Sequence, residues 1–286
     1  MAPFSLQNLP EIMVRPVVEA ALLEDLGRAG DITSEAVIPP DSRCNLVLTV
    51  RERGVVAGLE FARSAFTLID PTITFKSVCA DGEHVDAGTI LASIEGPARG
   101  VLMGERVALN FLGHLSGIAS ATARIVDAIK HTKAKIVCTR KTTPGLRFAE
   151  KYAIRAGGGV NHRFGLDDAI LIKDNHIAIA GGVANAMTRA KLYAGHLVKI
   201  EVEVDNLVQL EEALHYQPDA ILLDNMPLPI LREAVNLIQG RAIAEASGGI
   251  RVETVQAVAE TGVDLISAGW LTHSSKVLDI GLDFAG

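Results

Sequence analysis

The second half of the chain alternates short apolar runs with helical patterns, and this alternation constrains the fold more than any other feature. Residues 206–215, 229–239 and 253–261 have helical patterns. Strand and helix in regular alternation predict a parallel sheet with helices on its faces. Six such units in about 140 residues favour an α/β barrel, and a doubly wound sheet stays open because periodicity does not show closure. The apolar runs are residues 134–138, 169–172, 197–204, 220–223, 241–246 and 264–268.

The first half has a different pattern, which predicts a smaller domain containing both helices and β-strands. Helical patterns cover residues 11–27, 58–69 and 104–130, and strand-like runs cover residues 46–50, 73–78 and 89–94. We place the boundary between the two domains close to residue 114, so that they cover residues 1–114 and 115–272. Residues 81–96 resemble the hairpins of biotinyl and lipoyl carrier domains, but no lysine stands at a hairpin tip, so we expect an ordinary glycine-turned hairpin.

Composition excludes several classes of protein. The hydrophobic content of 49% describes a soluble globular protein with a large core, and the net charge of −7 argues against non-specific nucleic-acid binding. Three widely separated cysteines without a C-x-x-C pair disfavour a disulfide scaffold and suit the reducing cytoplasm. The N-terminal residues do not resemble a signal peptide, and no apolar run approaches the ~18–20 residues of a membrane span, so we expect no membrane association.

One stretch reverses the charge of the chain. Cys138 to His176 contains seven Lys or Arg and four acidic residues, a formal charge of +3 in a chain of −7. Arg140 and Lys141 follow one apolar run directly, and Lys173 follows the next. Charges that follow buried strands lie at the strand C-terminal ends, where α/β proteins place their chemistry. A cationic region in an acidic protein predicts a local anionic ligand.

The remaining strand ends predict one polar rim. Two ends are acidic, and the last two are small and glycine-rich, so they expose backbone N–H groups that suit a phosphate; an ordinary βα turn is the alternative. The acidic ends are Glu203/Asp205 and Asp224/Asn225, and the glycine-rich ends are Ser247/Gly248/Gly249 and Ser267/Gly269.

The strand before residue 205 places Lys199, Glu201 and Glu203 on one face, because side chains alternate with period two. We expect an internal Lys199–Glu201 ion pair, with Glu203 nearer the mouth. Glu203 and Asp224 together suit Mg²⁺, which favours carboxylates with ligand phosphates and water. A purely structural ion-pair network is the alternative.

The cationic side chains differ in their expected roles. Arginine grips carboxylate or phosphate with a planar fork, whereas lysine acts as a point charge, so this group requires a polyanion. The group comprises Arg140, Lys141, His162, Arg163 and Lys173. We interpret Arg147, Lys151 and Arg155 as a solvated helix face, and Cys138 as buried packing. His176 and His273 could each be a ligand or a helix cap, and we assign no role to either.

Several motifs together resemble the quinolinate phosphoribosyltransferase family (nicotinate-nucleotide pyrophosphorylase, carboxylating). In the second half they are T-R-K-T-T-P-G-L-R, G-G-G-V-N-H-R, I-L-I-K-D-N-H, I-E-V-E-V-D, L-L-D-N, E-A-S-G-G-I and I-S-A-G-W-L-T-H, and in the first half G-E-R-V-A-L-N-F-L and S-G-I-A-S. The resemblance runs from about residue 25 to the C-terminus. One departure is Trp270, where a small or aliphatic residue is expected beside Gly269.

The resemblance implies a fold, an activity and an assembly. The fold is an N-terminal α/β sandwich, rejoined by the C-terminal segment 273–286, followed by an incomplete, TIM-like α/β barrel. Quinolinate and 5-phosphoribosyl 1-pyrophosphate would give nicotinate mononucleotide, pyrophosphate and CO₂ with Mg²⁺, in de novo NAD synthesis. The enzyme would be a cytoplasmic homodimer or higher homo-oligomer whose subunits share each active site.

The resemblance also implies residue roles. Arg106 would reach in from a neighbouring subunit; Arg140, His162 and Arg163 would hold the quinolinate carboxylates, with Lys141 and Lys173 facing pyrophosphate or carboxylates. Glu203 and Asp224 would hold Mg²⁺ or ribose hydroxyls. Among the substrate-binding and catalytic residues we also expect Thr139 and Ser267, while Ser247, Gly248, Gly249 and Gly269 would hold the 5-phosphate. Rival hypotheses are a related phosphoribosyltransferase, a Schiff-base aldolase using Lys141 or Lys173, and a non-catalytic carrier module.

Overall fold

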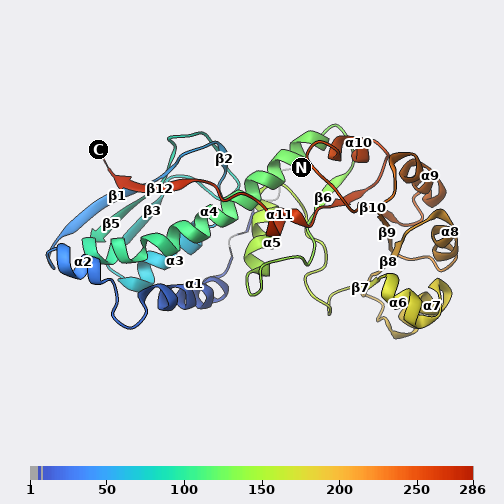
Figure 1. Cartoon of the computed structure of the whole chain (residues 1–286), viewed down its shortest axis with the longest axis horizontal. Helices are drawn as coiled ribbons and strands as arrows, with labels where there is room; N and C mark the ends of the chain where they lie inside the picture. Colours follow the sequence, from blue (N-terminus) through green and yellow to red (C-terminus); the bar gives the residue numbers. More distant parts are fainter. Residues whose placement is uncertain (1–5, 8, 286) are drawn as a thin grey trace. The chain divides into compact units, whose positions relative to one another are not determined.

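The computed structural model describes residues 6, 7 and 9–285, which divide into two compact units. The first unit comprises residues up to 123 together with 143–158 and the segment from 274 onward; the second comprises 124–142 and 159–273. The expected mixed α/β fold class is confirmed, with an antiparallel sheet in the first unit and a six-stranded parallel sheet in the second (Figure 1). No described helix has the length and the apolar character needed to cross a membrane.

The first unit is built around a four-stranded antiparallel sheet with the order β12-β1-β5-β3. Its outermost strand, β12, comes from the C-terminal segment and pairs with β1, so the end of the chain completes this sheet. The strands are β1 (Arg43–Val50), β3 (Thr74–Ser77), β5 (Ile90–Pro97) and β12 (Ile280–Phe284), and β2 (Gly54–Val55) pairs separately with β4 (His84–Val85). The helices are α1 (Glu11–Leu26), α2 (Ile32–Val37), α3 (Leu59–Ile69), α4 (Ala98–Ile129), whose last six residues belong to the second unit, and α5 (Arg147–Ala156).

The segment expected to form a tight hairpin is less simple in the structure. β3 and β5 are antiparallel, but the chain between them makes a detour in which β4 pairs with β2. Gly82 and Gly88 have φ values of 91° and 88°, so both adopt a backbone conformation that favours glycine. The expected turning role of the glycines is therefore confirmed, whereas the single tight hairpin is wrong.

The second unit contains all six expected strands, and their order shows how the sheet is arranged. The order β6-β11-β10-β9-β8-β7 brings the last strand, β11, beside the first, β6. In a doubly wound sheet the order of the strands reverses at a central strand. Here the strands from β7 to β11 are neighbours in chain order and β11 is followed by β6, which is the order of a barrel that stays open between β6 and β7. The strands are β6 (Lys135–Val137), β7 (Ile170–Ile172), β8 (Ile200–Val204), β9 (Ala220–Asp224), β10 (Ile243–Ser247) and β11 (Leu265–Ser267).

Helices cover the outside of this open barrel, as Figure 1 shows for α8, α9 and α10. The helices of the unit are α6 (Asp174–Ala180), α7 (Val183–Tyr193), α8 (Leu207–His215), α9 (Leu228–Ile238), α10 (Val255–Ala259) and the short α11 (Trp270–His273). Many apolar residues of the strands are buried, and Val202, Ile221 and Ile266 have 0% exposure. Burial of each such side chain contributes about 1.5–3 kcal/mol, which holds the strands and therefore their polar ends in place.

Two expected charge placements are wrong. Lys199 does not pair with Glu201: its Nζ lies 2.5 Å from Asp219 Oδ1, because Lys199 stands before the first residue of β8, at the end of the strand opposite Glu203. Lys151 does not belong to a solvated face, since only 2% of it is exposed on α5. Arg155, one turn further along α5, is exposed as expected.

Candidate active site

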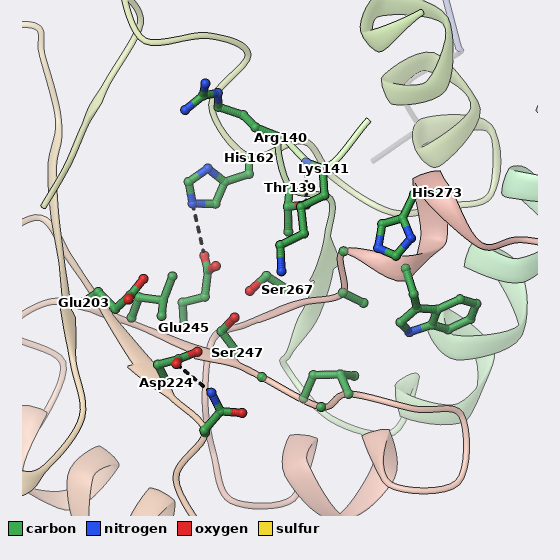
Figure 2. A pocket seen from close by; sticks show the side chains of 18 of the residues that line it. Thr139, Arg140, Lys141, His162, Glu203, Asp224, Glu245, Ser247, Ser267 and His273 are labelled. Atoms are coloured by element: carbon green, nitrogen blue, oxygen red, sulfur yellow. Dashed lines mark hydrogen bonds and ion pairs between the residues drawn. The ribbon is translucent and has the colours of Figure 1, made fainter. Parts of the chain in front are cut away.

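The polar strand ends of the second unit line one cavity of about 1010 Å³. Every predicted site residue except Arg106 lies on its wall, and Figure 2 shows several of them pointing into the same space (Figure 2). Arg106 is exposed on α4, in a part of that helix that belongs to the first unit. The predicted residues on the wall are Thr139, Arg140, Lys141, His162, Arg163, Lys173, Glu203, Asp224, Ser247, Gly248, Gly249, Ser267 and Gly269.

Two arginines give the cavity a cationic wall. Arg163 Nη1 donates to the carbonyl oxygen of Ala169 at 3.0 Å, which fixes one edge of its guanidinium. The Nε atoms of Arg140 and Arg163 are buried and have no hydrogen-bond partner among the described residues. Burial, and then the positive charge of Arg140, lower the pKa of Arg163. Two adjacent, partly desolvated cations are costly by themselves, so the arrangement suits a ligand with more than one negative charge.

Lys173 follows β7 and crosses to the neighbouring strand. Its Nζ lies 2.6 Å from Glu203 Oε2 on β8, whose carboxylate is largely buried. The backbone N–H of Lys173 donates to His176 Nδ1 at 2.9 Å, so His176 caps the start of α6. The ion pair keeps a cation and a carboxylate together on the cavity wall.

A short turn after β6 fixes Lys141. Its backbone N–H donates to Thr139 Oγ1 at 3.1 Å, and its carbonyl oxygen accepts from Thr272 Oγ1 at 2.7 Å. A Cβ at Gly269 would lie 3.0 Å from Lys141 Cδ, so glycine there leaves room for the lysine stem. The side chain of Lys141 then points toward Ser267 (Figure 2).

The glycine-rich end of β10 has the geometry of an anion-binding turn. Gly248 and Gly249 have φ values of 92° and 59°, a conformation that suits glycine. A Cβ on Gly248 would collide with the side chain of Asn225, which holds Asp224 Oδ2 at 2.6 Å through its Nδ2. Successive backbone N–H groups in such a turn form a concave site for an anion.

His162 lies over two buried carboxylates. Its Nε2 is 2.8 Å from Glu201 Oε2 and 3.7 Å from Glu245 Oε2, and its Nδ1 accepts the backbone N–H of Arg163 at 2.8 Å. Glu245 is 1% exposed. Burial, and then the negative charge of Glu201, raise the pKa of Glu245 to about 7, and His162 opposes them. This carboxyl therefore takes up a proton far more readily than an ordinary glutamic acid.

Sequence reasoning missed several residues of the wall. Glu245 lines the cavity, and the alternation of side chains along β10 could have placed it on the same face as Ser247. His273 lines the cavity from α11; it is the last residue of the I-S-A-G-W-L-T-H motif, but the sequence by itself assigns it no role.

Trp270 also lines the cavity, and its indole Nε1 is buried without a hydrogen-bond partner among the described residues. It is the only tryptophan of the chain. We therefore expect intrinsic fluorescence to change saturably when an anionic ligand fills the cavity, because burial and new polar contacts alter the indole environment. Titration of the protein with inorganic pyrophosphate, a multiply charged anion, checks this, with Trp270→Phe as the blank. An unchanged emission at saturating ligand contradicts placement of the ligand beside this residue.

Comparisons with known proteins agree with one another. Residues 31–116 match the family described as "Quinolinate phosphoribosyl transferase, N-terminal domain", and residues 118–283 match the corresponding C-terminal domain. The "Probable nicotinate-nucleotide pyrophosphorylase [carboxylating]" of Bacillus subtilis is 43% identical over 95% of this chain and 93% of its own length. The nicotinate-nucleotide pyrophosphorylase [carboxylating] of Mycobacterium leprae is also 43% identical, over 94% and 96%. The solved nicotinate-nucleotide pyrophosphorylase of Francisella tularensis superposes with a TM-score of 0.93 at 38% identity, covering 97% of this chain and 98% of that one.

Proposed function

Because the chain belongs to the quinolinate phosphoribosyltransferase family, we propose that it transfers the phosphoribosyl group of 5-phosphoribosyl 1-pyrophosphate to quinolinate. The products are nicotinate mononucleotide, pyrophosphate and CO₂, a step of NAD biosynthesis. One observation carries the proposal: a cationic wall, in which two arginine Nε atoms have no partner in the described part of the chain, shares a cavity with a carboxylate pair and a glycine-rich turn. Each part suits one portion of the two substrates.

Arg140 and Arg163 would hold the two carboxylates of quinolinate. A planar guanidinium grips a carboxylate through two parallel hydrogen bonds, and a dianion offsets the mutual repulsion of the two cations. This grip would aim the ring nitrogen at C1 of the ribose, which is a positioning task. We retain His162 in the site by family resemblance, although both of its ring nitrogens already have partners in the protein.

The chemistry then needs no covalent bond to the protein. The ring nitrogen donates its electron pair to C1 as the bond from C1 to pyrophosphate breaks, so positive charge develops on the sugar and negative charge on the leaving group. Glu203 and Asp224 would stabilise the sugar, and Lys141 and Lys173 the pyrophosphate. When the C–C bond to the 2-carboxylate breaks, its electron pair stays on the ring carbon, where the positive charge of the adjacent pyridinium nitrogen stabilises it. CO₂ leaves, and the ring carbon takes a proton.

The carboxylates of Glu203 and Asp224 fit a Mg²⁺ ion. Both line the cavity, and Mg²⁺ binds through one or two carboxylates while it keeps waters and substrate phosphates. Such an ion would neutralise charge on the leaving pyrophosphate. The glycine-rich turns, with Ser247 and Ser267, would hold the 5-phosphate.

We also propose that the protein acts in the cytoplasm as a homodimer or larger assembly. None of the three cysteines forms a disulfide within the part of the chain that the structure describes, which suits a reducing compartment. Arg106 lies exposed on the first unit, outside the wall of the cavity, so a role for it fits a site completed by a second subunit.

A direct assay tests the proposed reaction. The protein is incubated with quinolinate labelled in its 2-carboxylate, 5-phosphoribosyl 1-pyrophosphate and Mg²⁺, and both released CO₂ and nicotinate mononucleotide are measured. We expect the two products in equal amounts, no turnover with a chelator, and recovery when Mg²⁺ is restored. Product from nicotinate but not from quinolinate would assign the protein to a related phosphoribosyltransferase instead. The ion pair of Lys173 with Glu203 argues against a Schiff-base aldolase that uses Lys173 as its nucleophile, because that chemistry needs a neutral amine.

A further inference from the structure

His162 has a defined protonation pattern because of its neighbours. The backbone N–H of Arg163 is a donor, so Nδ1, which lies 2.8 Å from it, must be an acceptor without a proton. A neutral ring then carries its proton on Nε2, and that N–H donates to Glu201 Oε2 at 2.8 Å. Both ring nitrogens are therefore engaged within the protein, and the ring is a bridge between a buried carboxylate and the backbone of Arg163.

This pattern argues against a metal ion at the same place. His162, Glu201 and Glu245 offer ligand atoms within 4.8 Å of one another, which is close enough to surround an ion. A metal-bound imidazole needs a free electron pair on the ligating nitrogen and normally donates a hydrogen bond from the other. Here the nitrogen facing the carboxylates carries the proton, and the other one faces a donor.

The position of Glu201 separates it from the substrate. It is 8% exposed and lies on β8, which is flanked by β7 and β9, and it does not line the cavity that His162 and Arg163 line. Its Oε1 has no partner among the described residues, and Glu245 Oε1 has none either. A buried carboxylate with one satisfied oxygen is costly, so its contact with His162 constrains the ring strongly.

The constraint extends to Arg163. The His162 ring fixes the N–H of Arg163, and Arg163 Nη1 holds the carbonyl oxygen of Ala169 at 3.0 Å, so the arginine is held at both its backbone and its guanidinium. If the ring could rotate, the first of these two restraints would be lost. The guanidinium would then sample several orientations. A displacement of about 1 Å in a group that positions the substrate greatly lowers the reaction rate.

We propose that Glu201 is a positioning residue for binding of the pyridine dicarboxylate, which acts by orienting His162 and, through it, the backbone of Arg163. Glu245 on β10 also helps to orient the His162 ring, since its carboxylate Oε2 lies 3.7 Å from the same Nε2. The inference rests on the proposed function for the identity of the ligand. It adds a residue outside the cavity wall that determines the affinity for one of the two substrates only.

Two substitutions of Glu201 test this. Glu201→Gln and Glu201→Leu both remove the charge and nearly preserve the size, but only glutamine keeps an oxygen that can accept from Nε2. We expect Glu201→Leu to raise KM for quinolinate ~30-fold or more, with KM for 5-phosphoribosyl 1-pyrophosphate changed less than threefold. Glu201→Gln should stay within about fivefold of the parent enzyme for both substrates, because the acceptor is retained.

The controls separate position from general damage. Glu260 Oε1, in the same unit, lies 3.2 Å from His131 Nε2 in an exposed pair whose residues do not line the cavity. Glu260→Leu makes the same glutamate-to-leucine substitution beside a histidine, and it should leave both KM values unchanged. Thermal unfolding midpoints of all variants show whether the fold persists. If Glu201→Leu does not fold, Glu201→Met makes the same comparison with an unbranched side chain.

The outcomes are distinct. The proposal is overturned by an equal rise of both KM values in a folded variant, by an unchanged KM for quinolinate, or by glutamine being as damaging as leucine. It is also overturned if metal analysis of the parent enzyme finds a stoichiometric ion that is absent from Glu201→Leu. A parent enzyme that does not convert quinolinate contradicts the proposed function itself, which the same assay reports separately.

Discussion

Replacing Arg163 by alanine is expected to lower kcat/KM for quinolinate by about 30- to 1000-fold, equivalent to ~2–4 kcal/mol. The guanidinium is partly buried beside Arg140, and its Nε has no hydrogen-bond partner among the described residues. Without the guanidinium, one carboxylate of the substrate would lie against a partly desolvated part of the cavity wall with no counter-ion. Steady-state kinetics with quinolinate as the varied substrate measure the effect.

A matched substitution shows that the loss comes from the cavity. Arg232 is exposed on α9 and does not line the cavity, so Arg232→Ala should keep kcat/KM within twofold. A loss of less than threefold for Arg163→Ala would contradict its role as a clamp. A loss of kcat/KM for 5-phosphoribosyl 1-pyrophosphate alone would instead assign Arg163 to binding of the sugar substrate.

Mixing two inactive variants should restore activity if the subunits share their sites. Arg106→Ala and Lys141→Ala should each lose at least ~100-fold alone, because each removes a cation from a polyanion site. In a mixed dimer, one site carries both changes and the other carries neither. Random pairing makes half of the dimers mixed, so the mixture should recover about a quarter of the parent activity.

Co-expression of the two chains with different tags, followed by sequential purification, isolates the mixed dimer for the assay. The control pairs Lys141→Ala with Arg163→Ala, which lie on the wall of the same cavity. Every site of that mixture carries one defect, so its activity should stay at the level of the single variants. No recovery with the Arg106 variant would exclude a shared site.

The strand ends were predictable because a simple rule governs them. Parallel strands that follow one another around a barrel bring their C-terminal ends to one edge, so polar residues after Val137, Ile172 and Val204 must meet. The sequence marks those ends clearly, since each charge follows an apolar run. The cavity could therefore be assembled from spacing before any contact was known.

The failures have an equally physical origin. Period-two alternation places Lys199 and Glu201 on one face, but it does not say that Lys199 stands at the opposite end of the strand, beside Asp219. The pairing of Glu201 with His162 depends on a loop that returns from elsewhere in the chain. The same holds for Lys151, because helical spacing does not reveal which side of α5 the rest of the first unit covers.

The gap between β6 and β7 has a consequence for solubility as well as for chemistry. An uncovered strand edge invites pairing with other chains. Here Val160 forms a parallel bridge to Val137, and its N–H donates to Ile136, so this short segment shields β6. His162 and Arg163 come two and three residues later. Substitutions that destabilise the segment around Val160 should therefore weaken ligand binding and also promote aggregation. Selection for activity then also protects the chain from self-association.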